Sequence, residues 1–257
     1  MWGEIDKPVE RERGLNKARP KNNATQERET TMDSISAFDN ALLAERKGEY
    51  QQALQMFQTC LAEDEYNPGE VLFHCGWCSE HVSNGDNTQA LRYYELAAVD
   101  TINPECRLNS FFRAGWLLMH QKKHAKAATM FRYAIDYAEL SHHKNETYNQ
   151  SAFWYAVCLE SQEWYIEAIR WYRLVRLVSP HLDPESRLRE LACLNRVGSF
   201  HEALGLCCTF DSPPPIGFDE RRYHELQSVV SRERAMLERC VADRSFLTNA
   251  KVHYGTC

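Results

Sequence analysis

The sequence lacks any apolar run long enough to cross a membrane. Its longest apolar stretches, such as FFRAGWLLM at residues 111–119, are far shorter than the roughly 20 residues that a spanning helix needs. The sequence also has no excess of positive charge. Its 36 Asp and Glu residues outnumber its 30 Lys and Arg residues, and the net charge is −6. Residues 1–23 are charged throughout and lack the apolar centre of a secretory signal. We therefore expect a cytoplasmic protein without membrane insertion and without nucleic-acid binding.

No stretch alternates between apolar and polar residues for long enough to indicate a strand. From Ser34 onward the apolar residues recur at intervals of three and four, which is the period of a helix. Residues 1–33 mix charges with few large apolar side chains, so we predict a disordered extension, and one hypothesis places the native start at Met32. With 44% hydrophobic residues, the rest of the chain is predicted to be all-α with a sizeable core.

A helical pair repeats five times along the chain. In each pair the second helix begins near an alanine and usually carries an aromatic residue four positions after it. The five alanines are Ala53, Ala90, Ala127, Ala168 and Ala203. Successive alanines are 37, 37, 41 and 35 residues apart. Gly48, Gly85 and Gly198 lie at the turn inside three pairs, where a residue that tolerates positive φ ends the first helix. Prolines such as Pro68, Pro104 and Pro180 lie between pairs. Five units in one alignment favour a solenoid over an irregular helical bundle.

This pattern resembles the tetratricopeptide repeat. Residues 151–180 match best, with Ala156, Tyr165, Ala168, Tyr172 and Pro180 at the characteristic places. The fifth pair departs from the pattern, because Leu191 and Cys207 stand where a small residue and an aromatic are usual. The resemblance implies a right-handed α-solenoid over residues 34–218.

Residues 219–257 are predicted to form a capping helix and a tail, since a solenoid needs a terminal element with a polar outer face. Its apolar side is expected to carry Tyr223, Leu226, Val230, Met236, Leu237 and Cys240. A second arrangement, in which this helix folds into the groove of the array, stays open.

The segment FHCGWCSEH, residues 73–81, carries two cysteines and two histidines. His74 and His81 are two helical turns apart, about 10 Å, which is too far for easy convergence on one zinc ion. The Cys75 and Cys78 pair lacks the preceding strand of thiol oxidoreductases. We interpret Cys78 as the small residue equivalent to Gly115 and Ala156, and Cys75 as a groove residue. Most of the ten cysteines are expected to be free thiols, and no metal or cofactor is predicted.

In arrays of this family the first helices line a concave groove. By the resemblance, the residues predicted to face it are Phe38, Leu42, Leu72, Cys75, Val82, Asn109, Phe112, Trp116, Met119, His120, Phe153, Val157, Asn195 and Arg196. We expect Phe112, Trp116 and Phe153 to be the main contacts with a helix or an extended apolar segment of a partner. The other interpretation of these aromatics is that they fill the core between pairs.

No set of residues in the sequence assembles a catalytic site, so we predict no enzyme activity. The favoured function is a scaffold or adaptor that binds a partner protein or peptide in the groove. The alternative is a regulatory sensor that responds to metal or redox state through its cysteines and histidines. The sequence carries no signal for the oligomeric state.

Overall fold

The computed structural model describes residues 36–62, 66–83, 85–215 and 218–254, and residues 36–257 group into one compact unit. The predicted extension at residues 1–33, with Met32, lies outside the described residues. Within them the chain forms eleven α-helices and two short 3-10 helices, and no strand occurs there. The prediction of an all-α fold is confirmed.

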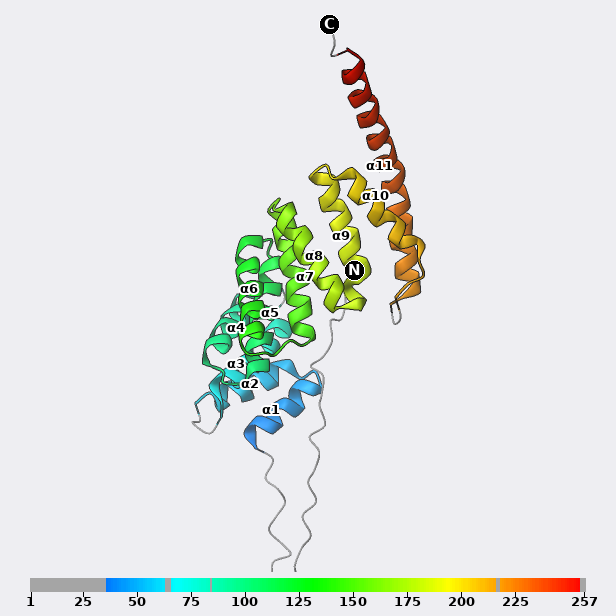
Figure 1. The fold of residues 1–257 in the computed structure, drawn as a ribbon. Coiled ribbons are helices and arrows are strands. Elements are labelled where there is room, and N and C mark those ends of the chain that lie inside the picture. The colour runs from blue at the N-terminus through cyan, green and yellow to red at the C-terminus, as the bar shows by residue number, and fades with distance from the viewer. Residues whose placement is uncertain (1–35, 63–65, 84, 216–217, 255–257) are drawn as a thin grey trace, which may run out of the picture. The chain divides into compact units, whose positions relative to one another are not determined.

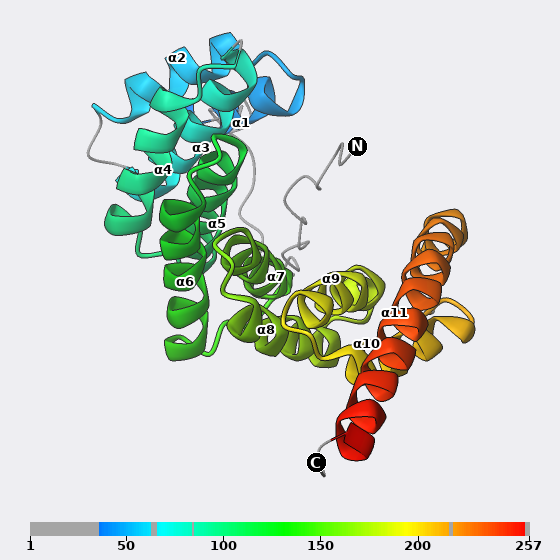
Figure 2. The same ribbon diagram turned by 90° about the horizontal axis from the view of Figure 1, so that it is seen from above.

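Ten of the helices form five consecutive pairs, seen in Figure 1 as a series running from blue to yellow. The pairs are α1 (Ala37–Arg46) with α2 (Tyr50–Cys60), α3 (Pro68–Val82) with α4 (Thr88–Asp100), α5 (Pro104–His120) with α6 (His124–Leu140), α7 (Glu146–Ser161) with α8 (Tyr165–Val178), and α9 (Asp183–Arg196) with α10 (Phe200–Cys208). Each of these helices packs on its neighbours along the chain. Figure 2 shows α5, α7 and α9 along the inner side of the curve that the pairs describe, with α6 and α8 outside.

Asparagine side chains cap the N-termini of three of the first helices. Asn67 Oδ1 accepts a hydrogen bond from the amide of Gly69 at the start of α3, and Asn103 does the same for α5. Asn145 caps α7 by accepting from the amide of Tyr148 at 3.2 Å. Such caps satisfy amides that have no partner inside the helix, and the prolines Pro68 and Pro104 fit the first helical position because they need no donor there.

The turn inside each pair has a residue with positive φ, five positions before the repeated alanine. Gly48, Gly85 and Gly198 take this conformation with φ of 80°, 102° and 76°, as the sequence predicts. In the third and fourth pairs the same place is held by Lys122 and Glu163, with φ of 58° and 65°. A side chain is strained in this region, so these two turns are less stable locally than the glycine turns.

The repeated alanines form the centre of the core. Ala53, Ala127, Ala168 and Ala203 are fully buried and Ala90 is 1% exposed. The residue four positions after each of them is also fully buried: Phe57, Tyr94, Phe131, Tyr172 and Cys207. Small residues of the first helices make room for these rings, since a Cβ on Gly76 would lie 2.8 Å from the Tyr94 ring and a Cβ on Gly115 would lie 2.9 Å from the Phe131 ring.

At each junction between successive pairs, three side chains from the same three positions of the repeat come into contact. At the second junction Glu80 accepts hydrogen bonds from Tyr94 Oη at 3.0 Å and from Arg113 at 2.5 Å. The fourth junction repeats this arrangement with Glu160, Tyr172 and Arg189.

The other two junctions have different residues at the same three positions. At the first, His74 Nδ1 lies 2.8 Å from Glu45 Oε2 and its ring stacks on Phe57. At the third, the equivalent residues are Met119, Phe131 and Trp154; Phe131 and Trp154 belong to the largest apolar cluster, and Met119 packs against it. The core between pairs is therefore polar at three junctions and apolar at one.

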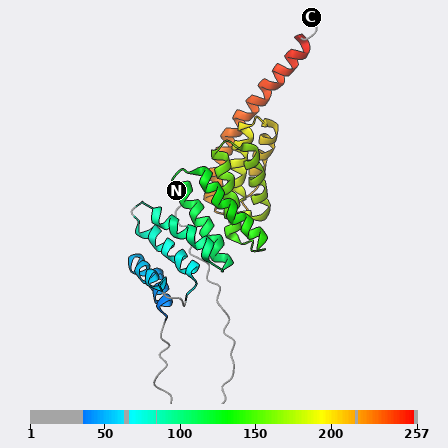
Figure 3. The same ribbon diagram turned by 90° about the vertical axis from the view of Figure 1, so that its left-hand side faces the viewer.

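The last helix, α11 (Glu220–Tyr254), packs on α9, α10 and the 3-10 helix Thr209–Asp211 (Figures 1 and 3). Tyr223, Leu226, Val230 and Leu237 are buried, as expected for a cap. Two of the predicted residues are not buried, since Met236 is 44% exposed and Cys240 is partly exposed. The cap thus covers the last pair, and Figure 3 shows that α11 continues past it.

Candidate functional site

The candidate site is the inner face, which we define as the exposed surface of the first helices α3, α5 and α7. Its main features are two tryptophans with histidines one turn later. Trp77 and Trp116 are partly exposed, and His81 and His120 are exposed. The Trp77 and His81 rings are 4.4 Å apart, and the Trp116 and His120 rings are 4.5 Å apart.

Neighbouring helices hold the two tryptophans in place. The Arg113 guanidinium of α5 lies 4.7 Å from the centre of the Trp77 ring, and Trp154 of α7 meets Trp116 edge to face at 4.9 Å. A guanidinium over an indole and an edge-to-face pair of rings are both favourable arrangements. Each tryptophan is therefore positioned before any partner binds.

The structure divides the fourteen predicted groove residues into five that are buried and nine that are partly or fully exposed. The buried residues are Leu72, Cys75, Phe112, Phe153 and Val157. Phe112 and Phe153 belong to the core between pairs, which is the second interpretation that the sequence left open. Asn109, Trp116 and Met119 are partly buried and His120 is exposed, so these four lie together on α5 where a partner can reach them. The Asn109 side chain accepts a hydrogen bond from Thr147 Oγ1 at 2.8 Å.

The alignment of the second pair requires a correction. Five residues separate α3 from α4, whereas three separate α5 from α6, so the first helix is displaced by two positions relative to the repeated alanine. Gly76, and not Cys78, is the equivalent of Gly115, because each faces the aromatic ring of its own pair. Cys78 instead donates a hydrogen bond to Glu45 of the first pair.

This displacement also explains why Cys75 does not face the groove. Its side chain has an exposed fraction of 0% and packs with Ala41, Ala53 and Phe57 in the core formed with the first pair. Trp77 and His81 are absent from the predicted groove residues for the same reason. The signal that could have identified them is the pattern Gly-Trp-x-x-x-His, which occurs at residues 76–81 and again at residues 115–120.

The cysteines are packed as apolar side chains. Burial raises the pKa of Cys75, Cys158 and Cys193 to about 12. A thiol reacts as the thiolate, so these groups are unreactive near neutral pH. Among the described residues, no group of three or more His, Cys, Asp or Glu side chains is placed to hold a metal ion.

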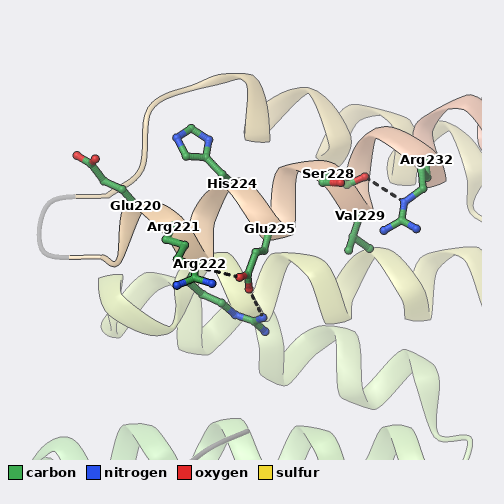
Figure 4. A pocket seen from close by; sticks show the side chains of 8 residues that line it. All are labelled: Glu220, Arg221, Arg222, His224, Glu225, Ser228, Val229 and Arg232. Atoms are coloured by element: carbon green, nitrogen blue, oxygen red, sulfur yellow. Dashed lines mark hydrogen bonds and ion pairs between the residues drawn. The ribbon is translucent and has the colours of Figure 1, made fainter.

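A separate hollow of about 920 Å³ runs along α11 (Figure 4). Figure 4 shows Glu225 between Arg221 and Arg222, and both arginines pair with it at 3.8 and 3.1 Å. Arg232 Nε donates to the carbonyl oxygen of Ser228. Arg222 also pairs with Glu185 of α9 at 2.9 Å, so Arg222 and Glu225 are both engaged in ion pairs with their neighbours.

The described helices include none long and apolar enough to span a bilayer. No protein-family model and no curated protein sequence matches the chain. Among solved structures, the TPR protein YrrB is similar over 70% of this chain and 85% of its own, with a TM-score of 0.55 and 17% identity. A MamA protein is similar over 78% of this chain and 92% of its own, with a TM-score of 0.54 and 15% identity.

TPR-like repeats of a putative kinesin light chain from Podosopora anserina are similar over 76% of this chain and 95% of their own, with a TM-score of 0.51 and 13% identity. The chain folds as a tetratricopeptide-repeat array. Over the residues that the structure describes, the array has five pairs and a terminal helix, in agreement with the repeat count that the sequence predicts. At these identities the likeness establishes the fold alone.

Proposed function

We propose that this array is a cytoplasmic protein-interaction scaffold that holds a peptide or helix of a partner protein on the inner face, without catalysing a reaction. The observation that carries the proposal is the pair of tryptophan and histidine subsites at Trp77/His81 and Trp116/His120. They occupy equivalent positions on adjacent first helices, and a segment lying across α3 and α5 would meet both.

The chemistry of the inner face supports this role. Large aromatic side chains supply much of the binding energy at protein interfaces, especially when they are held rigidly before binding. YrrB is described as a TPR protein with an unusual peptide-binding site, so an array of this fold can bind a peptide. Asn109, Met119 and His120 would contribute the remaining contacts on α5.

A selection of binding peptides from a random library on the full chain tests the proposal. Selected peptides are expected to lose affinity by at least about 30-fold with Trp77→Ala and with Trp116→Ala, which corresponds to a loss of about 2 kcal/mol. Tyr133→Ala is the matched control, because this aromatic is 51% exposed on α6. Circular dichroism should show an unchanged helix content in all three variants. Peptides that bind all variants equally would place the site elsewhere.

A further inference from the structure

A second surface lies at the edge of the array, where the turn between α5 and α6 meets the turn between α7 and α8. The first of these turns and the start of α6 carry three exposed lysines: Lys122, Lys123 and Lys126. Within the described part of the chain none of the three forms an ion pair, and Lys123 Nζ makes its hydrogen bond to the neutral Gln121 side chain at 2.8 Å. These three lysines therefore carry positive charges that no ion pair among the described residues neutralises, in a protein whose net charge is −6.

The lysines line a common hollow. It has a volume of about 460 Å³, and its walls are Lys122, Lys123, His124 and Lys126 on one side and Ser161 and Gln162 of the next pair on the other. Ser161 and Gln162 donate hydrogen bonds to carbonyl groups of their own helix, so neither neutralises a lysine. The hollow is large enough for a few side chains, and too small for the long basic track that a nucleic-acid strand requires.

Apolar surface continues from the hollow along the second turn. Trp164 follows Gln162 by two residues and is 60% exposed, and Ile166 is 56% exposed at the beginning of α8. An exposed tryptophan two residues after a wall of the lysine hollow is complementary to a segment that combines carboxylates with an apolar side chain. Positive side chains at the start of α6 are also unfavourable for the helix itself, because the N-terminal end of a helix dipole is positive. A bound carboxylate would remove that repulsion.

We propose that this edge docks an acidic segment of a partner protein, with the carboxylates on Lys122, Lys123 and Lys126 and an apolar side chain on Trp164. The site is separate from the inner face and goes beyond the function proposed for it. The acidic segment would approach from the turns, whereas the inner-face partner would lie across α3 and α5. The two surfaces would let one array hold two segments at once.

Binding of a fluorescently labelled synthetic peptide, rich in glutamate and carrying one phenylalanine, tests the proposal by anisotropy with the full chain. We expect saturable binding that weakens as salt is raised, because surface charges are screened within about 10 Å at 0.1 M salt. The variant Lys122→Gln/Lys123→Gln/Lys126→Gln should bind about tenfold more weakly, and Trp164→Ala should also lose affinity.

Two single variants separate binding from folding. Lys122→Gly and Glu163→Gly place glycine at the same positive-φ position of adjacent turns, so each should keep or raise the melting temperature. Only Lys122→Gly should lower the affinity for the acidic peptide. Glu163→Gly should bind the peptide as tightly as the parent or more tightly, because it removes a nearby negative charge.

Three results would overturn the edge site: no saturable binding by the parent chain, equal binding by the triple lysine variant, or equally tight binding of a polyuridine RNA that displaces the peptide. Trp116→Ala distinguishes the two surfaces. It should leave the acidic peptide bound while it removes inner-face ligands, and loss of the acidic peptide in this variant would assign that peptide to the inner face.

Discussion

Arg113 of the third pair donates a hydrogen bond of 2.5 Å to Glu80 of the second pair, and the same Glu80 accepts from Tyr94. The pair is mostly shielded from water, with 13% of the Arg113 side chain and 15% of the Glu80 side chain exposed. The equivalent positions at the next junction hold Met119, Phe131 and Trp154. Two kinds of packing thus occupy equivalent positions in one molecule.

Glu80→Met alone should lower the free energy of unfolding by about 3 kcal/mol, because Arg113 and the Tyr94 hydroxyl lose their acceptor. The triple variant Glu80→Met/Tyr94→Phe/Arg113→Trp copies the apolar junction and should lie within about 1.5 kcal/mol of the parent. Urea denaturation followed by circular dichroism measures both. If the triple variant is as unstable as the single one, the junctions are not interchangeable.

Gly76→Ala and Gly115→Ala should each cost about 1–3 kcal/mol, since the added methyl groups would press on the rings of Tyr94 and Phe131. Gly205→Ala is the control, because nothing lies within 4 Å of a Cβ there and the residue is inside α10. This control should stabilise the array by up to about 1 kcal/mol. Melting temperatures of the three variants check this predicted order of stability. An equal change in stability at all three positions would contradict the assigned packing.

Stability should fall as the pH rises above about 9. The pKa of Cys75, Cys158 and Cys193 rises from 9.0 to about 12 in the folded state, so these thiols keep their protons there after the unfolded chain has released them. Burial likewise raises the pKa of Tyr94 and Tyr172 well above 10.0.

The stability that these groups contribute is complete below pH 9 and is lost as the pH approaches 12. Each thiol adds at most about 1.4 kcal/mol per pH unit to the slope within that window. Urea midpoints measured from pH 8 to pH 11 report the effect. A Cys158→Ala variant should show a shallower slope than the parent, and a flat profile in the parent would refute the burial of these thiols.

Alkylation should distinguish packed thiols from accessible ones. Cys208 is exposed and Cys240 is partly exposed, so iodoacetamide should modify both in the native protein, while Cys75 and Cys78 react only after unfolding. Mass spectrometry of peptides after timed labelling gives the order. Rapid modification of Cys75 at neutral pH would revive the redox-sensor alternative, because a reactive thiol must be both accessible and partly ionised.

Local patterns in the sequence are sufficient to predict much of the fold. The helical period, the repeated alanines and the apolar side of residues 219–257 predict the pairs and the cap, since each depends on neighbours three or four positions apart. Positive φ at Gly48, Gly85 and Gly198 follows in the same way from a local steric rule.

Only the tertiary structure decided the alignment of the second pair and the surface that it presents. Two extra residues before α4 leave the helical pattern of α3 unchanged, so the sequence could not separate Cys78 from Gly76 by period alone. The tertiary packing shows that Gly76 faces Tyr94 and that Cys75 is covered by the first pair. Exposure depends on side chains of adjacent pairs, and for that reason the junction networks and the lysine edge beside Gln162 emerge only when the pairs are stacked.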